Sequence, residues 1–404
     1  MRSTDIRLDG TLRSAHSSAD RGEHGYDTER LWGAVPGDGG RPVRRGDARH
    51  DGCLPPPDGA DRDAGVVHGG GQCASGGGDP DGGLVRADGR GATAGGFRFD
   101  QTVVPGGYAW WYVDAISDDG AYGLALIAFI GSVFSPYYAW SRRRGVADPL
   151  RHCALNVALY GRGRRRWALT ERGSGAVQRG ANWLRIGPSM LAWNGTALTV
   201  WIDEITAPLP SRVRGVIRLH PLQVESRVMT LDGAARHRWS PIAPCARIEV
   251  ALDRPASRWS GVAYCDTNEG DAPLEADFQR WNWCRAHTEG GTTVLYDLAG
   301  RDDTRRTLAM RYAATGGATD FDPPTEWVLP RSRWGVTRAV RGDAREAARV
   351  VTTLQDTPFY ARSLVETRLL GEPMVAMHES LDLDRFRTPW VQAMLPFRMP
   401  RAWR

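Results

Sequence analysis

From Phe97 onward, short apolar runs alternate with turn signals, a pattern that is typical of β-strands rather than helices. Residues 246–252 are one example, because strand side chains point to alternate faces and Ile248, Val250 and Leu252 then share one face. Arginine, glutamate and alanine occupy the positions between them. The alternation therefore predicts a strand with one apolar face and one largely polar face.

Two turn dipeptides, Asn194-Gly195 and Asp232-Gly233, lie between apolar runs. Such dipeptides are strong hairpin signals, because a type I′ turn needs positive φ at both central residues. Long helical periods are scarce. The nearest candidate, residues 343–355, contains a Val-Val-Thr-Thr run and fits a helix or a strand equally.

Many even strands without alternating helices predict a sandwich or a barrel. The fold class expected is therefore all-β. The part of the chain after residue 96 has about 308 residues, which is enough for two domains of ordinary size. We place them side by side at residues 97–250 and 251–404, with the boundary set by halving.

Residues 1–96 have a different composition. They hold 23 of the 48 glycines, and only 11 of these 96 residues are Leu, Ile, Val or Phe. So few large apolar residues cannot offset the conformational entropy of folding. We expect an N-terminal extension that is disordered, or that is not made in the natural protein.

The charged residues of the chain exclude two kinds of catalytic or binding site. The chain contains no lysine, which excludes a lysine Schiff base and the lysine of a Walker A loop. Residues 97–404 carry 40 Arg against 32 Asp and Glu, a net charge of +8. Arginines are denser at residues 142–144 and 162–166. They fit solvated loops, or contact with anionic lipid or nucleic acid.

Cysteine usage and one apolar segment bear on the compartment. Six cysteines without a CxxC pair, and an opening without an apolar stretch after basic residues, predict free thiols in a reducing cytoplasm. The segment Tyr122–Trp140 has nearly the length of a membrane span. However, Gly131, Ser132, Ser135 and Pro136 interrupt its second half, so we expect one or two buried strands.

Several familiar sites are missing from the sequence. No GxGxxG motif stands between a strand and a helix, no GxSxG occurs, and His378-Glu379 lacks the second histidine of HExxH. The nine histidines show no metal-ligand spacing, so we expect no metal and no nucleotide cofactor. Fifteen of the 16 tryptophans follow residue 96. Most suit a barrel core, but their number also suggests a large apolar ligand.

Two short strand segments pair an acid or a base with an aromatic ring. Alternation places His237 and Trp239 on one face of the first segment, and Tyr264 and Asp266 on one face of the second. A single histidine or aspartate on a strand is more often a structural residue than a catalytic one. Together, the two pairs make the region a candidate site.

The sequence around these residues resembles the acyclic carotenoid 1,2-hydratase (hydroxyneurosporene synthase) family of phototrophic bacteria. The resemblance covers nearly all of the chain from Phe97 onward. Residues 1–96 show no resemblance to the family. The stretches that carry it are residues 99–138, 153–161, 237–244, 261–286, 356–363 and 378–403.

The resemblance implies a lipocalin-like all-β fold and cofactor-independent addition of water to the terminal C1=C2 bond of neurosporene or lycopene. It also points to His237, Trp239, Tyr264 and Asp266 as the catalytic set. We expect Asp266 to be the acid, Trp239 and Tyr264 to stabilise the cation, and His237 to be the base, with swapped roles for His237 and Asp266 left open.

Four other tryptophans are expected to bind substrate: Trp110, Trp111, Trp281 and Trp283. The expected partners are an acyclic carotene, water and the cytoplasmic side of a membrane, to which the protein binds peripherally, and not nucleic acid. Two rival functions remain open at this point. One is a non-catalytic lipocalin-like carrier of a polyene or other lipid, and the other is a hydrolase that pairs Asp266 with Glu249 or Glu269.

Overall fold

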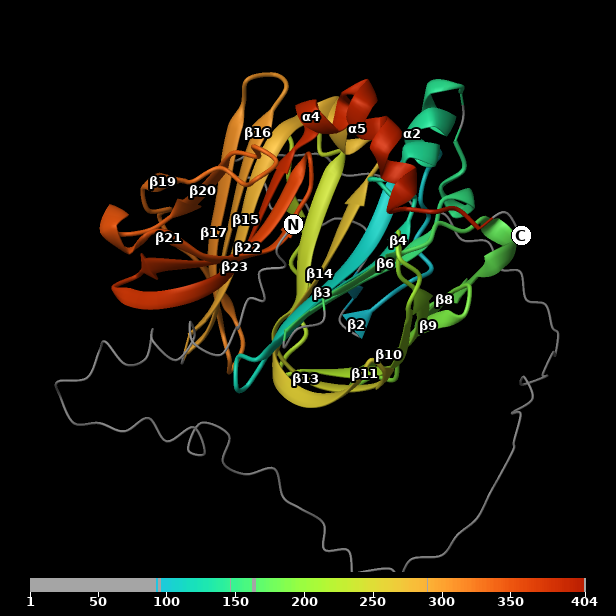
Figure 1. The fold of residues 1–404 in the computed structure, drawn as a ribbon. Coiled ribbons are helices and arrows are strands. Elements are labelled where there is room, and N and C mark those ends of the chain that lie inside the picture. The colour runs from blue at the N-terminus through green and yellow to red at the C-terminus, as the bar shows by residue number, and fades with distance from the viewer. Residues whose placement is uncertain (1–91, 94–95, 146, 162–164, 289, 403–404) are drawn as a thin grey trace, which may run out of the picture. The chain divides into compact units, whose positions relative to one another are not determined.

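A computed structural model describes residues 92–93, 96–145, 147–161, 165–288 and 290–402 (Figure 1). Nearly all of the predicted extension, residues 1–91 with 94–95, lies outside the described residues. Two large antiparallel sheets account for most of the described chain, so the all-β expectation is confirmed. Two further two-stranded pairs are β1 (Ala92–Thr93) with β2 (Gly96–Phe97), and β19 (Glu326–Leu329) with β20 (Arg338–Arg341).

The first sheet has the order β6-β5-β4-β3-β14-β13-β11-β10-β9-β8-β7, with β12 paired to β13. It consists almost entirely of hairpins between consecutive strands. Its members are β3 (Tyr108–Ser117), β4 (Tyr122–Ile130), β5 (Ala154–Gly161), β6 (Arg166–Leu169), β7 (Val177–Gly180), β8 (Trp183–Ile186), β9 (Ser189–Trp193), β10 (Leu198–Ile205), β11 (Arg212–Pro221), β12 (Met229–Thr230), β13 (His237–Arg254) and β14 (Ala256–Gly270).

The second sheet has the order β18-β17-β16-β15-β23-β22-β21. Its members are β15 (Phe278–Thr288), β16 (Gly291–Gly300), β17 (Arg305–Ala313), β18 (Ala318–Asp320), β21 (Arg349–Asp356), β22 (Tyr360–Leu369) and β23 (Glu372–Asp382). The chain passes from the first sheet to the second through α3 (Leu274–Asp277). The expected boundary near residue 250 instead falls inside β13, because β13 and β14 form one long hairpin of the first sheet.

Short helices occupy the ends of the sheets. They are α2 (Pro136–Arg143), α4 (Leu383–Arg387) and α5 (Pro389–Met394), with 3₁₀ turns η2 (Pro149–Arg151), η3 (Ser174–Ala176), η4 (Arg345–Ala347) and η5 (Leu395–Phe397). Figure 1 shows α2, α4 and α5 at the same end of the two sheets.

The apolar segment Tyr122–Trp140 is only partly as expected. Its first half is the buried strand β4, but its second half begins α2, where the Ser135 side chain caps the helix by accepting from the Tyr138 amide. In the described part of the chain, no helix is both long and apolar enough to span a membrane.

Both predicted hairpins form, with turns that differ from type I′. Asn194-Gly195 joins β9 to β10 through a four-residue loop, in which the Asn194 carboxamide accepts from the amides of Thr196 and Ala197. Asp232-Gly233 joins β12 to β13. There the Asp232 carboxylate accepts from the His237 amide at 2.8 Å. The ambiguous segment 343–355 is mainly the strand β21.

The core has two layers because β3 is buried on both faces. Trp110 and Tyr112 belong to a cluster of aromatic and aliphatic side chains that comes from both sheets. Trp111 and Val113 belong to a second cluster, which is built almost wholly from the first sheet. Alternation along one strand therefore sends neighbouring side chains into different cores.

Candidate active site

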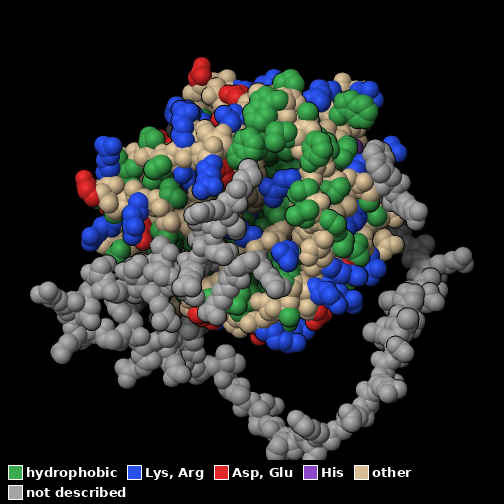
Figure 2. Space-filling model, viewed as in Figure 1, with side chains coloured by type: hydrophobic (Ala, Val, Ile, Leu, Met, Phe, Trp, Pro, Cys, Tyr) green, Lys and Arg blue, Asp and Glu red, His purple; other side chains and the backbone are tan. Residues whose placement is uncertain are grey.

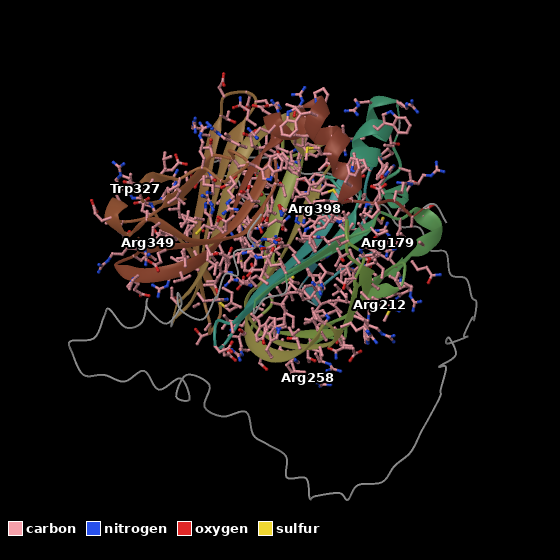
Figure 3. The ribbon with its side chains drawn as sticks, viewed as in Figure 1. Arg179, Arg212, Arg258, Trp327, Arg349 and Arg398 are labelled. Carbon is pink, nitrogen blue, oxygen red and sulfur yellow. The ribbon has the colours of Figure 1, made fainter. Side chains whose placement is uncertain are left out.

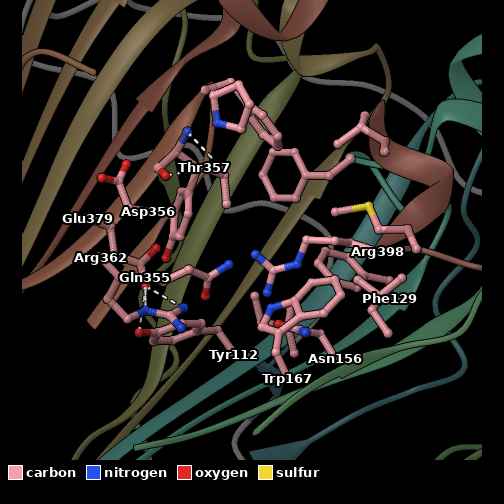
Figure 4. Close-up of a pocket in the computed structure, with 18 of the residues that line it drawn as sticks. Tyr112, Phe129, Asn156, Trp167, Gln355, Asp356, Thr357, Arg362, Glu379 and Arg398 are labelled. Carbon is pink, nitrogen blue, oxygen red and sulfur yellow. Dashed lines mark hydrogen bonds and ion pairs between the residues drawn. The ribbon is translucent and has the colours of Figure 1, made fainter. Parts of the chain in front are cut away.

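A cavity of about 390 Å³ lies among side chains from both sheets and from the C-terminal helices (Figure 4). Its wall is mostly aromatic and aliphatic. The polar groups on it include the side chains of Asp266, Asn268 and Glu379. A pocket of this size and composition suits an apolar ligand or one end of a longer one.

Three of the four tryptophans expected to bind substrate line this cavity: Trp110, Trp281 and Trp283. Trp111 does not. It points from the opposite face of β3 and packs 4.8 Å from the ring of Phe99 in the core of the first sheet. Trp111 is therefore not brought to this cavity, since successive residues of a strand point to opposite faces of the sheet.

Asp266 is brought together with Trp239 and Tyr264, as the strand alternation predicts. Its carboxyl group is buried, and its Oδ2 accepts hydrogen bonds from Trp239 Nε1 at 2.8 Å and from the Tyr264 hydroxyl at 2.9 Å. Within the part of the chain that the structure describes, Oδ1 is a buried oxygen without a hydrogen-bond partner. Neither donor is part of the cavity lining, so both act on Asp266 from behind.

The arrangement follows from the β13–β14 hairpin. Tyr264 and Asp266 are two residues apart on β14 and share a face, while Trp239 pairs with Asn268 across the ladder. The register shifts between Ser240 and Ala243, as it does at a β-bulge. Such a shift changes the twist of a strand locally and re-aims side chains next to it.

The two hydrogen bonds determine where a proton sits on the acid. The indole N–H can only donate, and the tyrosine hydroxyl donates to the same oxygen, so Oδ2 is held as an acceptor. The proton of neutral Asp266 is therefore carried by Oδ1. Burial raises the pKa of Asp266 to about 7, against the lowering effect of the bonds from Trp239 and Tyr264.

The arrangement suits proton donation to a poor base. A carboxylic acid that stays neutral near pH 7 can donate to an apolar substrate without first being charged. A cation formed beside it would face the rings of Trp110, Trp281 and Trp283. An aromatic face contributes about 0.5 to 2 kcal/mol to holding a cation, more when water is excluded.

His237 is fully buried and does not line the cavity. Its Nε2 lies 2.7 Å from Oδ2 of Asp277, and its Nδ1 lies 2.9 Å from the Tyr108 hydroxyl. Because a carboxylate only accepts, Nε2 donates to Asp277 and Nδ1 of the neutral ring accepts from Tyr108. Burial lowers the pKa of His237, which keeps the ring neutral.

The surroundings of His237 fit this structural contact. Its ladder partner is Gly270, and a Cβ at that position would lie 2.8 Å from His237 Nδ1. The Tyr108 ring in turn stacks on Trp110, with centroids 4.9 Å apart. His237, the expected base, therefore does not share the cavity with Asp266, and its contact with the cavity wall is indirect, through Tyr108 and Trp110.

Glu379 is the residue that the sequence reasoning missed. It lines the cavity from β23, where its Oε1 accepts from the Tyr112 hydroxyl and from Arg362 Nε, both at 2.8 Å (Figure 4). Neither Glu249 nor Glu269, the candidates for a second carboxylate, lines the cavity. A usable signal was present, since Glu379 is a charged residue between the apolar positions Met377 and Leu381 of a strand.

Comparison with known proteins gives a consistent result. Residues 126–404 match the family described as carotenoid hydratase CrtC. An acyclic carotenoid 1,2-hydratase of Thiocapsa roseopersicina is 54% identical over 403 residues, covering 100% of both chains. One of Rubrivivax gelatinosus is 50% identical over 404 residues, covering 99% of this chain and 100% of the relative.

A shorter relative matches only part of the chain. The acyclic carotenoid 1,2-hydratase of Cereibacter sphaeroides is 44% identical over 277 residues, which is 68% of this chain and 98% of the relative. The two longer relatives correct one expectation, since they align along essentially the whole chain. Residues 1–96 therefore do have counterparts among similar proteins.

Proposed function

Because the chain belongs to the carotenoid hydratase family, we propose that it adds water to the terminal C1=C2 bond of acyclic carotenes such as neurosporene and lycopene. The product is the 1-hydroxy carotenoid, a tertiary alcohol. The observation that carries the proposal is the unpartnered Oδ1 of Asp266 on an aromatic cavity. A carboxyl proton held there can reach an alkene that has no polar group of its own.

In the first step, the O–H bond of Asp266 breaks and a C–H bond forms at C2 of the substrate. The positive charge then resides on the tertiary C1, and Asp266 becomes a carboxylate. Water attacks C1 and loses a proton, which gives the alcohol. Every step uses water and protein groups, and the carboxyl group is restored when a proton returns to it.

The expected catalytic residues take the following parts. Trp239 and Tyr264 orient Asp266 so that its proton is on Oδ1. His237 is a positioning residue that holds Tyr108 and, through it, the cavity tryptophan Trp110. The tryptophans of the cavity wall stabilise the cation, in place of Trp239 and Tyr264, for which this role was expected.

We also propose that the cavity mouth rests on a membrane surface, from which the insoluble substrate enters. Exposed apolar side chains gather there: Trp390, Met394 and Phe397 come from α5 and η5, and Trp334 comes from the loop between β19 and β20. Trp334, Met394 and Phe397 also line the cavity, and Trp334 stacks on Trp390 at 6.4 Å. Figure 2 shows hydrophobic side chains over this end of the molecule, with arginine side chains around them.

Arginines at the same end suit anionic headgroups. Directly after α2, Arg144 lies 3.6 Å above the half-exposed ring of Trp140. On α2 itself, Arg143 is exposed, whereas Arg142 is paired with Glu275. Of the arginines labelled in Figure 3, Arg398 lies at the cavity, 4.5 Å above the Trp167 ring. Each basic side chain near an anionic surface contributes about 1 kcal/mol to binding.

The membrane proposal is tested by sedimentation with vesicles of neutral or anionic lipid at low and high salt. Phe397→Ser removes the most exposed of the four apolar side chains and should weaken binding. Leu209→Ser is the matched control, because Leu209 is equally apolar and 82% exposed but lies in the β10–β11 loop. Equal loss in both variants, or binding that ignores salt and anionic lipid, contradicts the proposal.

The activity is tested by incubating purified protein with lycopene in vesicles, without added cofactor, and measuring the 1-hydroxy product by mass spectrometry. Uptake of one oxygen from ¹⁸O-water into the product identifies hydration. A protein that binds lycopene with high affinity and forms no product would be the carrier, and the proposal would then be wrong.

A further inference from the structure

The proposed hydration releases one proton from the attacking water, and a group of the protein must accept it. Water that attacks C1 must give up a proton, and the only acceptor nitrogen of neutral His237 is occupied by Tyr108. Asp266 has just become a carboxylate, but its donation was to C2, the neighbouring carbon. The acceptor should therefore be a second group on the cavity wall.

We propose that Glu379 is that acceptor: its carboxylate positions the attacking water and takes the proton as oxygen bonds to C1. This inference rests on the proposed function and names a further catalytic residue for it. Three observations carry it, namely the place of Glu379 in the cavity, the way its carboxylate is held, and its relation to Asp266.

Glu379 and the acid reach the cavity from different sheets. Asp266 comes from β14 of the first sheet, whereas Glu379 comes from β23 of the second, and both line the same cavity. The Glu379 side chain keeps 13% of its exposure, so it is accessible from the cavity. Two carboxyl groups that enter one cavity from different sheets can reach the two carbons of one double bond.

The carboxylate is rigidly held on one oxygen. Tyr112 and Arg362 both bond to Oε1, and Arg362 also donates to the Tyr160 hydroxyl at 2.7 Å. Arg362 is 1% exposed and pairs with Glu379 directly across the β22–β23 ladder. A buried guanidinium keeps the charge of its partner tolerable in an apolar surrounding.

Tyr112 connects the two carboxyl groups. Its backbone pairs with Asp266 across β3 and β14, and its hydroxyl reaches Glu379. The negative charge of Glu379 adds to the effect of burial in raising the pKa of Asp266. Glu379 thus helps to keep the acid protonated.

The step balances. The water oxygen forms a bond to C1, and one O–H bond of the resulting oxonium breaks as its proton moves to Glu379. An oxonium is so strong an acid that even an ion-paired carboxylate accepts this proton. When the alcohol leaves, solvent removes the proton from Glu379 and delivers one to Asp266, which restores both groups.

Glu379→Gln tests the role, because the amide keeps the shape and the acceptor oxygen for Tyr112 and Arg362 but cannot take the proton. Lycopene turnover should fall about 100-fold or more, while the KM changes little. In D₂O, the variant should still form the cation and return it to the alkene, so deuterium should enter recovered lycopene at C2. Asp266→Asn should abolish this exchange.

Glu204→Gln is the matched control. Glu204 forms a buried ion pair with Arg172 at 2.7 Å and does not line the cavity. Its substitution removes a buried ion pair of the same kind, so stability should fall while turnover of the folded enzyme stays within about twofold. Glu379→Asp provides a second variant, which keeps the charge but shortens the reach, and should slow hydration more than exchange.

The outcomes separate the two proposals. Wild-type turnover in folded Glu379→Gln overturns the role of Glu379 and leaves the proposed hydration intact. Loss of both hydration and exchange in Glu379→Gln and Glu379→Asp also overturns it, because Glu379 then acts on the acid or on the fold. Absence of product from the wild-type enzyme overturns the proposed function itself.

Discussion

Asp266→Asn changes the cavity acid with the least change of shape. The amide oxygen can still accept from Trp239 and Tyr264, so the fold should be kept, but the group has no acidic proton to donate. Lycopene turnover should fall by a factor of at least about 100. In the wild-type enzyme, turnover should fall as the pH rises through about 7, the pKa of Asp266.

The same variant has a calculable effect on stability. The pKa of Asp266 is raised from 3.8 to about 7, so between these values the folded state keeps a proton that the unfolded state has released. The free energy of unfolding of the wild type therefore falls by about 1.4 kcal/mol per pH unit, about 4 kcal/mol in all. An asparagine side chain does not titrate, so the free energy of unfolding of the variant lacks this pH dependence. Relative to the wild type, the variant should gain about 4 kcal/mol between about pH 4 and about pH 8.

Urea unfolding followed by tryptophan fluorescence at both pH values measures this difference, and subtraction cancels the other titrating groups. Asp203→Asn is the control. Its hydrogen-bonded partner Arg212 lowers the pKa of Asp203, so that contribution is present throughout this range and is lost only at lower pH. A stability difference for Asp266→Asn that does not change with pH would refute the burial argument, and wild-type turnover would refute the assignment as acid.

Three further outcomes are expected. Tyr264→Phe removes a bond that lowers the pKa of Asp266, so the alkaline fall of the pH–rate profile should move to higher pH, with turnover down about tenfold for one hydrogen bond of about 1.4 kcal/mol. His237→Ala removes the partner of the Tyr108 hydroxyl and of Asp277 Oδ2, so it should cost about 2 to 3 kcal/mol of stability and reduce turnover. A variant that is stable but inactive would instead favour a direct role of His237 in the reaction. Deletion of residues 1–96 should leave lycopene turnover unchanged, because 68% of this chain covers 98% of the Cereibacter sphaeroides relative; a folded but inactive truncation would contradict this.

Much of the fold could be predicted because strand and hairpin signals are local. The burial pattern of β13 over residues 246–252 alternates as its sequence does. Turn dipeptides located two hairpins, although their exact geometry depends on side-chain bonds such as those of Asn194. Halving the chain placed the boundary at residue 250, which lies inside β13, because the length of a chain does not tell which strand changes sheets.

The acid and its two donors could also be predicted, because all three belong to one hairpin. Alternation along β13 and β14 was sufficient to bring Trp239, Tyr264 and Asp266 together. The same rule would have separated Trp110 from Trp111, which are adjacent in one strand and face different cores. Treating the tryptophans as a cluster in sequence hid that difference.

Glu379 and His237 show why the rest could not be read from the sequence. Their roles depend on partners that are distant in the chain: Tyr112 is 267 residues from Glu379, and Tyr108 is 129 residues from His237. Alternation assigns a side chain to a face but does not say which sheet that face meets. A histidine on an inward face is a possible base until its acceptor nitrogen is occupied, and a glutamate is a surface residue until an arginine from the neighbouring strand is buried against it. The proposed roles of Glu379 and His237 therefore depend on how the two sheets pack against each other, because the cavity forms between side chains of both sheets.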